Sequence, residues 1–213
     1  MLKIDLHVHT SELSLCGKSP AADMIESAIA HDLDALVLTD HDRLQPPARL
    51  QALKQRYAPF RIYGGVEVTV GSEHVLVLGI QDRALEAGDW RYPELHRFVR
   101  ARGGFMALAH PFRYQNTIEV DIERYPPDAL EGYSWNTPLR YIEQISALAQ
   151  RLGIPLLADS DAHHVERFGF YYNRVHGRPP DEQALLEALR AGDFSCIAPD
   201  CVEAPQTTPV AAR

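Results

Sequence analysis

Residues 4–9 read Ile-Asp-Leu-His-Val-His and close the first strand-like run of the chain. Side chains two apart on a β-strand point to the same face, so His7 and His9 share one face. Burying two unpaired imidazoles in an apolar core costs free energy, whereas two imidazoles on one face can bind the same metal ion. The positions of the other histidines and of the acidic residues decide between these two interpretations.

Apolar strand-like runs alternate along the chain with segments of helical periodicity. Ser19 and Pro20 are predicted to be the N-cap and the first residue of the first helix. At least six strand–helix units within one domain, residues 1–200, predict an α/β fold with a mostly parallel sheet closed into a distorted barrel. We expect residues 201–213 to form a flexible tail. The expected strands are residues 2–6, 34–40, 61–70, 74–80, 104–110, 129–135, 154–164, 169–175 and 194–198, and the later helices are residues 47–57, 93–102, 138–152 and 181–192.

Side chains that can bind metal recur at the ends of these strands. In a parallel barrel the carboxyl ends of the strands form one rim, where catalytic groups gather. Six of the ten histidines stand there, most of them beside an acidic residue, which predicts a metal centre. The other four, His31, His96, His164 and His176, are expected to be solvated or structural. The residues at the strand ends are His7, His9, Asp40, His41, Glu67, His74, His110, Asp161 and His163.

The polymerase and histidinol phosphatase (PHP) superfamily has successive motifs that five segments of this chain resemble. The resemblance covers residues 1 to about 197. It implies a distorted (β/α)7 TIM-like barrel with a cluster of two or three metal ions at the carboxyl ends of the strands, which hydrolyses phosphoesters. The five segments are Asp5-Leu-His7-Val-His9-Thr10, Thr39-Asp40-His41-Asp42, Gly65-Val-Glu67, His110-Pro111 and Ser160-Asp161-Ala-His163.

The resemblance also implies how the ligands are divided among the ions. Asp161 and His163 are expected to take part in catalysis as well, and Asp161 could help proton transfer. The implied groups are His7, His9, Glu67 and Asp161 for one ion; Glu67 as a bridge, with His74 and His110, for a second; and His41 with His163 for a third.

The third group departs from the family pattern. Many relatives have an Asp or a His six residues after the second motif histidine, where this chain has Leu15. Glu12 or Cys16 could complete the group, or the third position could stay empty. Glu12 is the better match for a mixed nitrogen and oxygen site, whereas the thiolate of Cys16 would favour zinc. Glu12 could equally be a solvated loop residue. A second departure is Asp159, where we expect a small residue such as glycine; it could crowd the site or orient a ligand.

Several neighbouring residues are candidates for supporting roles. Asp5 and Asp40 are predicted to accept hydrogen bonds from the imidazole N–H groups of the ligands. Arg113 follows His110 in a long loop, and its guanidinium could bind two phosphate oxygens; the alternative is a surface arginine paired with a nearby carboxylate. Arg43 is a weaker candidate for the same role. The aromatic residues Tyr114, Tyr133 and Trp135 could stack on a base or a sugar, but their default placement is in the core.

Composition limits the partners of the chain. A net charge of −8 is a poor match for a long polyanion, so no long nucleic acid is expected. No apolar run is long enough to span a membrane, and no signal peptide is visible. The three cysteines, Cys16, Cys196 and Cys201, form no disulfide framework, which favours a reducing compartment, the cytoplasm. The sequence has no signal for an oligomeric state.

The leading interpretation is a metal-dependent phosphoesterase that acts on a small phosphorylated molecule through metal-activated hydroxide. A nucleotide, a sugar phosphate and histidinol phosphate would all suit it. Two alternatives remain open: a non-catalytic metal-binding regulatory module on the same barrel, and a metal-dependent C–N hydrolase. The nitrogen-rich ligand set suits two or three zinc, manganese or iron ions, and magnesium alone would be unexpected.

Overall fold

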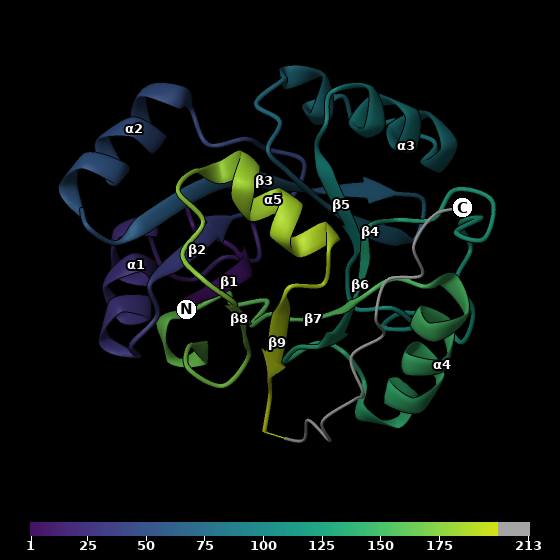
Figure 1. The fold of residues 1–213 in the computed structure, drawn as a ribbon. Coiled ribbons are helices and arrows are strands. Elements are labelled where there is room, and N and C mark those ends of the chain that lie inside the picture. The colour runs from purple at the N-terminus through teal and green to yellow at the C-terminus, as the bar shows by residue number, and fades with distance from the viewer. Residues whose placement is uncertain (200–213) are drawn as a thin grey trace.

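The computed structural model describes residues 1–199, in which nine strands form one sheet with five α-helices around it (Figure 1). The expected tail at 201–213, with Cys201, lies outside the described residues. The strands are β1 (Leu2–Val8), β2 (Ala35–Leu38), β3 (Arg61–Val70), β4 (Glu73–Leu78), β5 (Phe105–Leu108), β6 (Ala129–Tyr133), β7 (Leu156–Ala158), β8 (Tyr172–Val175) and β9 (Phe194–Ile197). The α-helices are α1 (Ala21–Ala30), α2 (Pro47–Arg56), α3 (Tyr92–Ala101), α4 (Ile142–Leu152) and α5 (Glu182–Arg190).

The strand order in the sheet is β7-β6-β5-β4-β3-β2-β1-β8-β9. Strand β4 is antiparallel to both of its neighbours, and β8 is antiparallel to β1 and β9. The remaining neighbours pair in parallel. The prediction of an α/β fold with a nearly closed, barrel-shaped sheet is confirmed. The prediction of a mostly parallel sheet is wrong, because four of the eight neighbouring strand pairs are antiparallel. Seven repeated βα units are not confirmed, because residues 1–199 hold nine strands and five α-helices, and β3 leads directly into β4 through a hairpin.

Side chains close the seam between the two ends of the sheet, where β7 lies beside β8 and β9 (Figure 1). The buried carboxamide of Asn173 in β8 makes the hydrogen bonds that the backbone of a neighbouring strand would otherwise make. Its Oδ1 accepts from the backbone N–H of Ala158 at 3.1 Å, and its Nδ2 donates to the Ala158 carbonyl at 2.9 Å. On β9, the thiol of Cys196 donates to the carbonyl of Leu156 at 3.0 Å. The barrel is thus completed by side-chain hydrogen bonds.

Helix α5 covers the amino-terminal end of the barrel. Its leucines Leu185, Leu186 and Leu189 are buried in one cluster with Leu2 and Ile4, which begin β1. Figure 1 shows α5 lying across the strands, with α1 and α2 on one side of the barrel and α3 and α4 on the other. The carboxyl end of β1, which carries the two histidines, therefore lies at the end of the barrel away from α5.

The first helix begins differently from the sequence-based prediction. Its first helical residue is Ala21, and Pro20 occupies the N-cap position without a side-chain cap. The prediction of Ser19 as N-cap is therefore wrong. Instead the carboxylate of Glu12 accepts from the Ala21 N–H, at 3.0 and 3.1 Å to its two oxygens, so a residue from the preceding loop satisfies this helix end.

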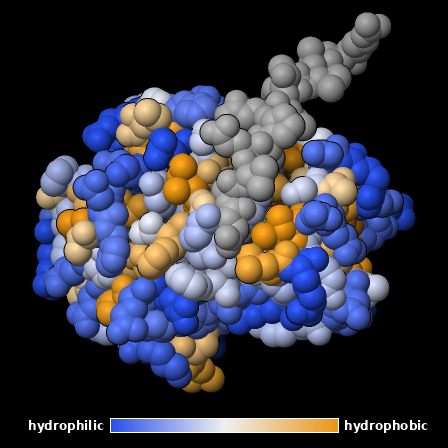
Figure 2. Space-filling view, turned by 90° about the horizontal axis from the view of Figure 1, so that it is seen from below, coloured by the Kyte–Doolittle hydropathy of each residue, from blue (hydrophilic) through white to orange (hydrophobic). Residues whose placement is uncertain are grey.

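The face drawn in Figure 2 is largely hydrophilic, with separate apolar patches. Among the described helices, none combines the length and the apolar character that crossing a membrane requires.

Candidate metal centre

A β-bulge in β1 brings both histidines of the first strand to the barrel interior. Leu6 packs in the interior cluster, whereas Val8 packs outside against α1. Leu6 and Val8 have the same parity, so a regular strand would place them on one face. The register of β1 against β2 shifts between Asp5 and Val8, which accounts for the change of face. As a result His7 and His9 point inward above the apolar core, and both are fully buried.

Four donor atoms converge in what we call the inner group: Nε2 of His7, Nε2 of His9, Oε2 of Glu67 and Oδ1 of Asp161. The His7 nitrogen lies 3.0 Å from that of His9, 3.2 Å from the Glu67 oxygen and 3.4 Å from the Asp161 oxygen. The His9 nitrogen lies 3.1 Å from each of the two oxygens. Four ligands at zinc bond lengths in a tetrahedron would be about 3.3 Å apart. These five distances are compatible with four side chains that share one metal ion.

The two carboxylate oxygens of the inner group have no other use in the structure. Within the described residues, Oε2 of Glu67 and Oδ1 of Asp161 are buried and have no hydrogen-bond partner, although imidazole nitrogens lie 3.1–3.4 Å away. Such contacts have the distance of a hydrogen bond without its direction. Buried carboxylate oxygens without a partner are costly, and a cation between them and the two imidazoles removes that cost. The residues thus fit a divalent metal ion.

Glu67 joins the inner group to further imidazoles. Its Oε1 lies 2.9 Å from Nδ1 of His74 and 3.0 Å from Nε2 of His110. Its Oε2 lies 3.2 Å from Nδ1 of His41. The predicted pairing of His74 and His110 around a bridging Glu67 is thus compatible with the geometry.

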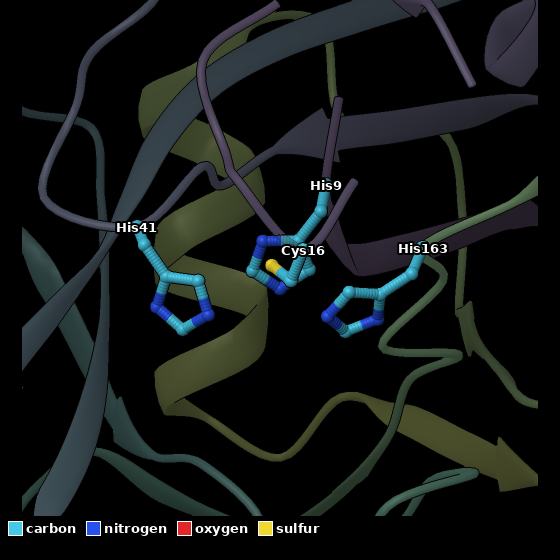
Figure 3. Close-up of side chains that lie close together, drawn as sticks. All are labelled: His9, Cys16, His41 and His163. Atoms are coloured by element: carbon cyan, nitrogen blue, oxygen red, sulfur yellow. The ribbon is translucent and has the colours of Figure 1, made fainter. Parts of the chain in front are cut away.

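The third set of donors lies beside the inner group (Figure 3). His9, Cys16, His41 and His163 each offer one ligand atom, and these atoms lie within 4.8 Å of one another. Glu12 is absent from this set. Its carboxylate pairs with Arg49 as well as with the N-terminus of α1. The structure therefore places Cys16, and not the preferred Glu12, next to the third histidine pair.

Glu131 is a buried residue of the site that the sequence did not indicate. Its Oε1 lies 2.8 Å from Nδ1 of His7, and its Oε2 accepts from the backbone N–H of His110 at 2.8 Å. A carboxylate in the middle of the apolar strand β6 was the available signal, because a fully buried charge needs a partner. Glu131 takes the role that we predicted for Asp5 and Asp40.

Those two aspartates have different partners. Asp5 accepts from the backbone N–H groups of His7 and Ser160. Asp40 accepts from the hydroxyl of Ser14 at 2.7 Å, and this hydroxyl lies 3.3 Å from Nδ1 of His9. Direct acceptance from an imidazole N–H is therefore wrong for both residues in this structure, although Asp40 reaches His9 through one hydroxyl.

Asp159, the second departure from the family pattern, belongs to the seam of the barrel. Its Oδ1 accepts from the backbone N–H of Leu6 at 2.8 Å and from Nδ2 of Asn173 at 2.7 Å. Burial, together with the nearby Asp5, raises the pKa of Asp159 well above its ordinary value. It neither crowds the donor groups nor enters them.

Two ligand candidates have strained backbones. The φ angles are +27° at His110 and +48° at Asp161, in a region that residues with a Cβ atom seldom adopt. Asp42, next to His41, has a φ of +50°. Strain of this kind concentrates at functional sites, where the surrounding structure holds it in place.

Without a metal ion, the imidazoles and carboxylates of the inner group neutralise one another. Burial alone would raise the pKa of the Glu67 carboxyl, but the His7 imidazole holds it well below its usual range. Burial alone would lower the pKa of His9, but the carboxylates of Asp161 and Glu67 raise it to about 9. A metal ion must displace the protons that these imidazoles carry.

The long loop that starts after His110 supplies Arg113 and Tyr114 to a small cavity beside the donor groups. Nη1 of Arg113 donates to Oδ2 of Asp161 at 3.1 Å. Tyr114 is 60% exposed, and its ring meets those of His74 and His110 edge-on. The core placement predicted for Tyr114 is therefore wrong, and so is that of Trp135, which is 38% exposed.

Tyr133 and the four histidines that were not predicted as ligands lie outside the donor groups. Tyr133 is buried, as predicted. His31 and His96 bond to backbone carbonyls, and His176 bonds to Asp193. Together with His164 they lie outside every donor group found among the described residues.

Comparisons with known proteins identify the family of the chain. The sequence matches the model of the PHP domain family over residues 5–126 and that of the PHP-associated family over residues 142–194. It is 32% identical over 200 residues to an error-prone DNA polymerase of Symbiobacterium thermophilum, covering 88% of this chain and 17% of that protein. The corresponding protein of Mycolicibacterium paratuberculosis is 32% identical over 198 residues, with coverage of 87% and 17%. The chain thus spans about a sixth of these relatives.

Among solved structures, a two-domain protein from Bacteroides vulgatus described as containing a predicted PHP-like metal-dependent phosphoesterase has a TM-score of 0.71 at 16% identity, covering 92% of this chain and 64% of that one. PsfC from Pseudomonas syringae has a TM-score of 0.68 at 22% identity, with coverage of 92% and 91%. An amidohydrolase from Chromobacterium violaceum has a TM-score of 0.62 at 20% identity, with coverage of 75% and 87%. These likenesses establish a shared fold.

Proposed function

The chain belongs to the PHP domain family, and on that premise we propose that it is a metal-dependent hydrolase that cleaves the phosphoester bond of a small molecule. The observation that carries the proposal is the pair of buried carboxylate oxygens, on Glu67 and Asp161, that face two imidazole nitrogens and have no hydrogen-bond partner among the described residues. This arrangement suits a cation.

Ions held here would supply Lewis acidity and a water molecule whose pKa is lowered towards 7. The protein's part is to orient the ligands. Glu131 accepts the Nδ1 proton of His7, which leaves the Nε2 lone pair directed into the inner group. The backbone carbonyl of Asp161 lies 2.8 Å from Nδ1 of His163 and fixes that ring in the same way. In this assignment the metal ligands are His7, His9, His41, Glu67, His74, His110, Asp161 and His163.

Asp161 has two differently placed oxygens, which supports a double role. Oδ1 belongs to the inner group, whereas Oδ2 accepts from Arg113 at 3.1 Å and from Nδ2 of Asn136 at 2.6 Å. A phosphate group that enters the site would compete for the guanidinium of Arg113, which is 25% exposed and can turn from Asp161 to the phosphate oxygens. We therefore assign Arg113 to substrate binding and Asp161 to metal binding and proton transfer.

The donor set also indicates which metal ions would bind here. Six imidazoles with two carboxylates suit two or three zinc, manganese or iron ions better than magnesium. A net charge of −8 disfavours a long nucleic acid, so we propose a small phosphorylated substrate, and the lack of a disulfide framework among the three cysteines supports a cytoplasmic location. Amide hydrolysis is the second candidate, because the same donors would activate water against a carbonyl and the fold is shared with an amidohydrolase.

The test uses protein purified without added metal. Metal content is measured on the same sample that is assayed with an aryl phosphate monoester, an aryl phosphate diester and an aryl amide. We expect two to three equivalents of transition metal and turnover of one ester. The variant His7→Ala should lose bound metal and should no longer turn over that ester. Turnover of the amide alone would replace the phosphoesterase with the C–N hydrolase. Bound metal without turnover of any of the three would favour a non-catalytic metal-binding module.

A further inference from the structure

Cys16 stands at the rim of the metal centre in a turn that is built to hold it there. The backbone N–H of Gly17 donates to the Ser14 carbonyl at 3.0 Å, and that of Lys18 donates to the His163 carbonyl at 2.7 Å. At Gly17 a Cβ atom would lie 2.4 Å from the Thr10 carbonyl oxygen, so only glycine allows the chain to fold back this closely. The turn between β1 and α1 is thus fixed to the loop that carries His163.

Side chains on this turn point in opposite directions. Leu15 is fully exposed, whereas Cys16 is half-buried and its sulfur lies with the imidazoles (Figure 3). The ring of His9 stacks on that of His163 at 4.4 Å and on that of His41 at 4.7 Å between ring centres. The three rings and the thiol therefore surround one space, which the Glu12 carboxylate does not enter.

The chemistry of this set differs from that of the inner group. The inner group pairs two imidazoles with two carboxylates, whereas here the donors are imidazoles and a thiol. Thiolate and imidazole ligands together favour zinc over manganese or magnesium, because the thiolate is the softer donor. His9 already directs its Nε2 towards Glu67 and Asp161, so the ligands available for a separate ion are Cys16, His41 and His163.

A second observation points to a cation at this position. The orphaned Oε2 of Glu67, which is fully buried, lies 3.2 Å from Nδ1 of His41 as well as beside His9. An unpartnered carboxylate oxygen therefore faces the imidazoles that the thiol borders. The cysteine is therefore one member of a converging set of ligands, next to a buried carboxylate oxygen that accepts no hydrogen bond from the described residues.

We propose that Cys16 supplies a thiolate ligand to the third metal position, with His41 and His163, and that this position consequently selects a thiophilic ion such as Zn²⁺. On binding, the thiol loses its proton to solvent and a sulfur–metal bond forms, with no change in oxidation state. The proposal rests on the metal centre of the proposed function. It makes the third position chemically distinct from the inner one.

Cobalt(II) tests this directly, because a thiolate ligand produces an intense near-ultraviolet charge-transfer band that imidazoles and carboxylates do not. The full chain is stripped with a chelator and titrated with Co²⁺. We expect the band in the wild type, its loss in Cys16→Ser together with one equivalent of metal, and its retention in the matched control Cys196→Ser. Cys196 lies in β9, where a serine hydroxyl could still donate to Leu156.

A second variant tests selectivity. Cys16→Asp keeps a ligand but replaces sulfur by oxygen, so we expect the equivalent to be retained without the band and the preference for Zn²⁺ over Mn²⁺ to fall at least about tenfold. Thermal unfolding and the remaining metal equivalents identify a variant that has misfolded.

The outcomes separate this proposal from the proposed function. A band in the wild type that persists in Cys16→Ser, a fully cobalt-loaded wild type without a band, or no cobalt binding at all would each overturn the ligand assignment. Ester turnover is measured on the same samples. A Cys16-dependent band without turnover of any ester supports the thiolate site and counts against the phosphoesterase. Turnover of an ester without the band supports the phosphoesterase and counts against the thiolate site.

Discussion

Nδ1 of His7 lies 2.8 Å from Oε1 of Glu131, and both side chains are completely buried. The two residues are 124 positions apart. The contact fixes the tautomer of His7, since a proton on Nδ1 leaves Nε2 free to face Glu67 and Asp161. The other oxygen of Glu131 holds the backbone of His110, so one carboxylate orients two candidate ligands.

Replacing Glu131 with glutamine therefore tests its positioning role. The amide has nearly the same shape, but its NH₂ group can face His7 and favour the wrong tautomer. We expect Glu131→Gln to lower metal affinity about 10–100-fold, measured by competition with a chromophoric chelator. Glu123→Gln, at an exposed glutamate paired with Arg151, is the matched control. Equal affinities for the two variants would show that Glu131 does not orient the ligands.

Arg113 is expected to act on substrate and not on metal. Loss of a charged hydrogen bond of about 1.5–3 kcal/mol corresponds to a decrease of about 10–100-fold in kcat/KM for the ester substrate of Arg113→Ala. The metal content should stay unchanged. Arg140→Ala, at an arginine that packs over Tyr141, is the control. If Arg113→Ala instead lost metal at normal kcat/KM per bound ion, the residue would have a structural role through Asp161.

Glu12 should matter for stability alone. Its carboxylate accepts from the first N–H of α1 and pairs with Arg49, so Glu12→Ala is expected to lower the free energy of unfolding by about 1 kcal/mol. Denaturant titration measures this, with Glu26→Ala, on the exposed side of the same helix, for comparison. Loss of a metal equivalent in Glu12→Ala would restore Glu12 as a ligand.

The seam of the barrel depends on Asn173. Removing its carboxamide leaves the backbone N–H and carbonyl of Ala158 without these partners in a buried place. We expect Asn173→Ala to lower the free energy of unfolding by about 2–4 kcal/mol. Asn116→Ala, in the exposed loop, should change it by less than about 0.5 kcal/mol. Similar values for both variants would mean that the seam is closed mainly by packing.

The metal-free protein should lose stability as the pH rises. The folded-state pKa of His9 is raised from 6.5 to about 9 by Asp161 and Glu67 against the opposing effect of burial. A raised pKa stabilises the fold fully below the unfolded value, and this contribution disappears as the pH rises through the folded value. The Tm of chelator-treated protein should therefore fall between pH 6.5 and 9, and bound metal should remove most of this fall. A Tm that does not change over this range without metal would contradict the charge pairing.

Much of the candidate site could be predicted from the sequence. The strand ends and the residues His7, His9, Glu67 and Asp161 were identified because alternation along a strand and the position of a strand end are local properties. The common rim of a barrel then brings such ends together whatever the details of the connections. The strands predicted at residues 61–70 and 74–80, which the structure shows as β3 and β4, follow from the same local periodicity.

Local sequence patterns could not decide which residue faces the third histidine pair. Cys16 faces the histidines because of the turn that Gly17 permits. Glu12 does not, because its carboxylate accepts a hydrogen bond from the first backbone N–H of α1. The bulge in β1 depends on what Leu6 and Val8 each pack against.

By itself, the sequence determined the class of fold and most of the candidate metal ligands, since strand periodicity and residue chemistry are carried by short segments. Only the tertiary structure decided that Glu131 orients His7, that Asn173 closes the barrel and that Cys16 borders the third position. Each of these joins residues from different strands or loops, and Glu131 and His7 are 124 positions apart. A buried polar group must find its partner in space, and no pattern along the chain specifies which residue that will be.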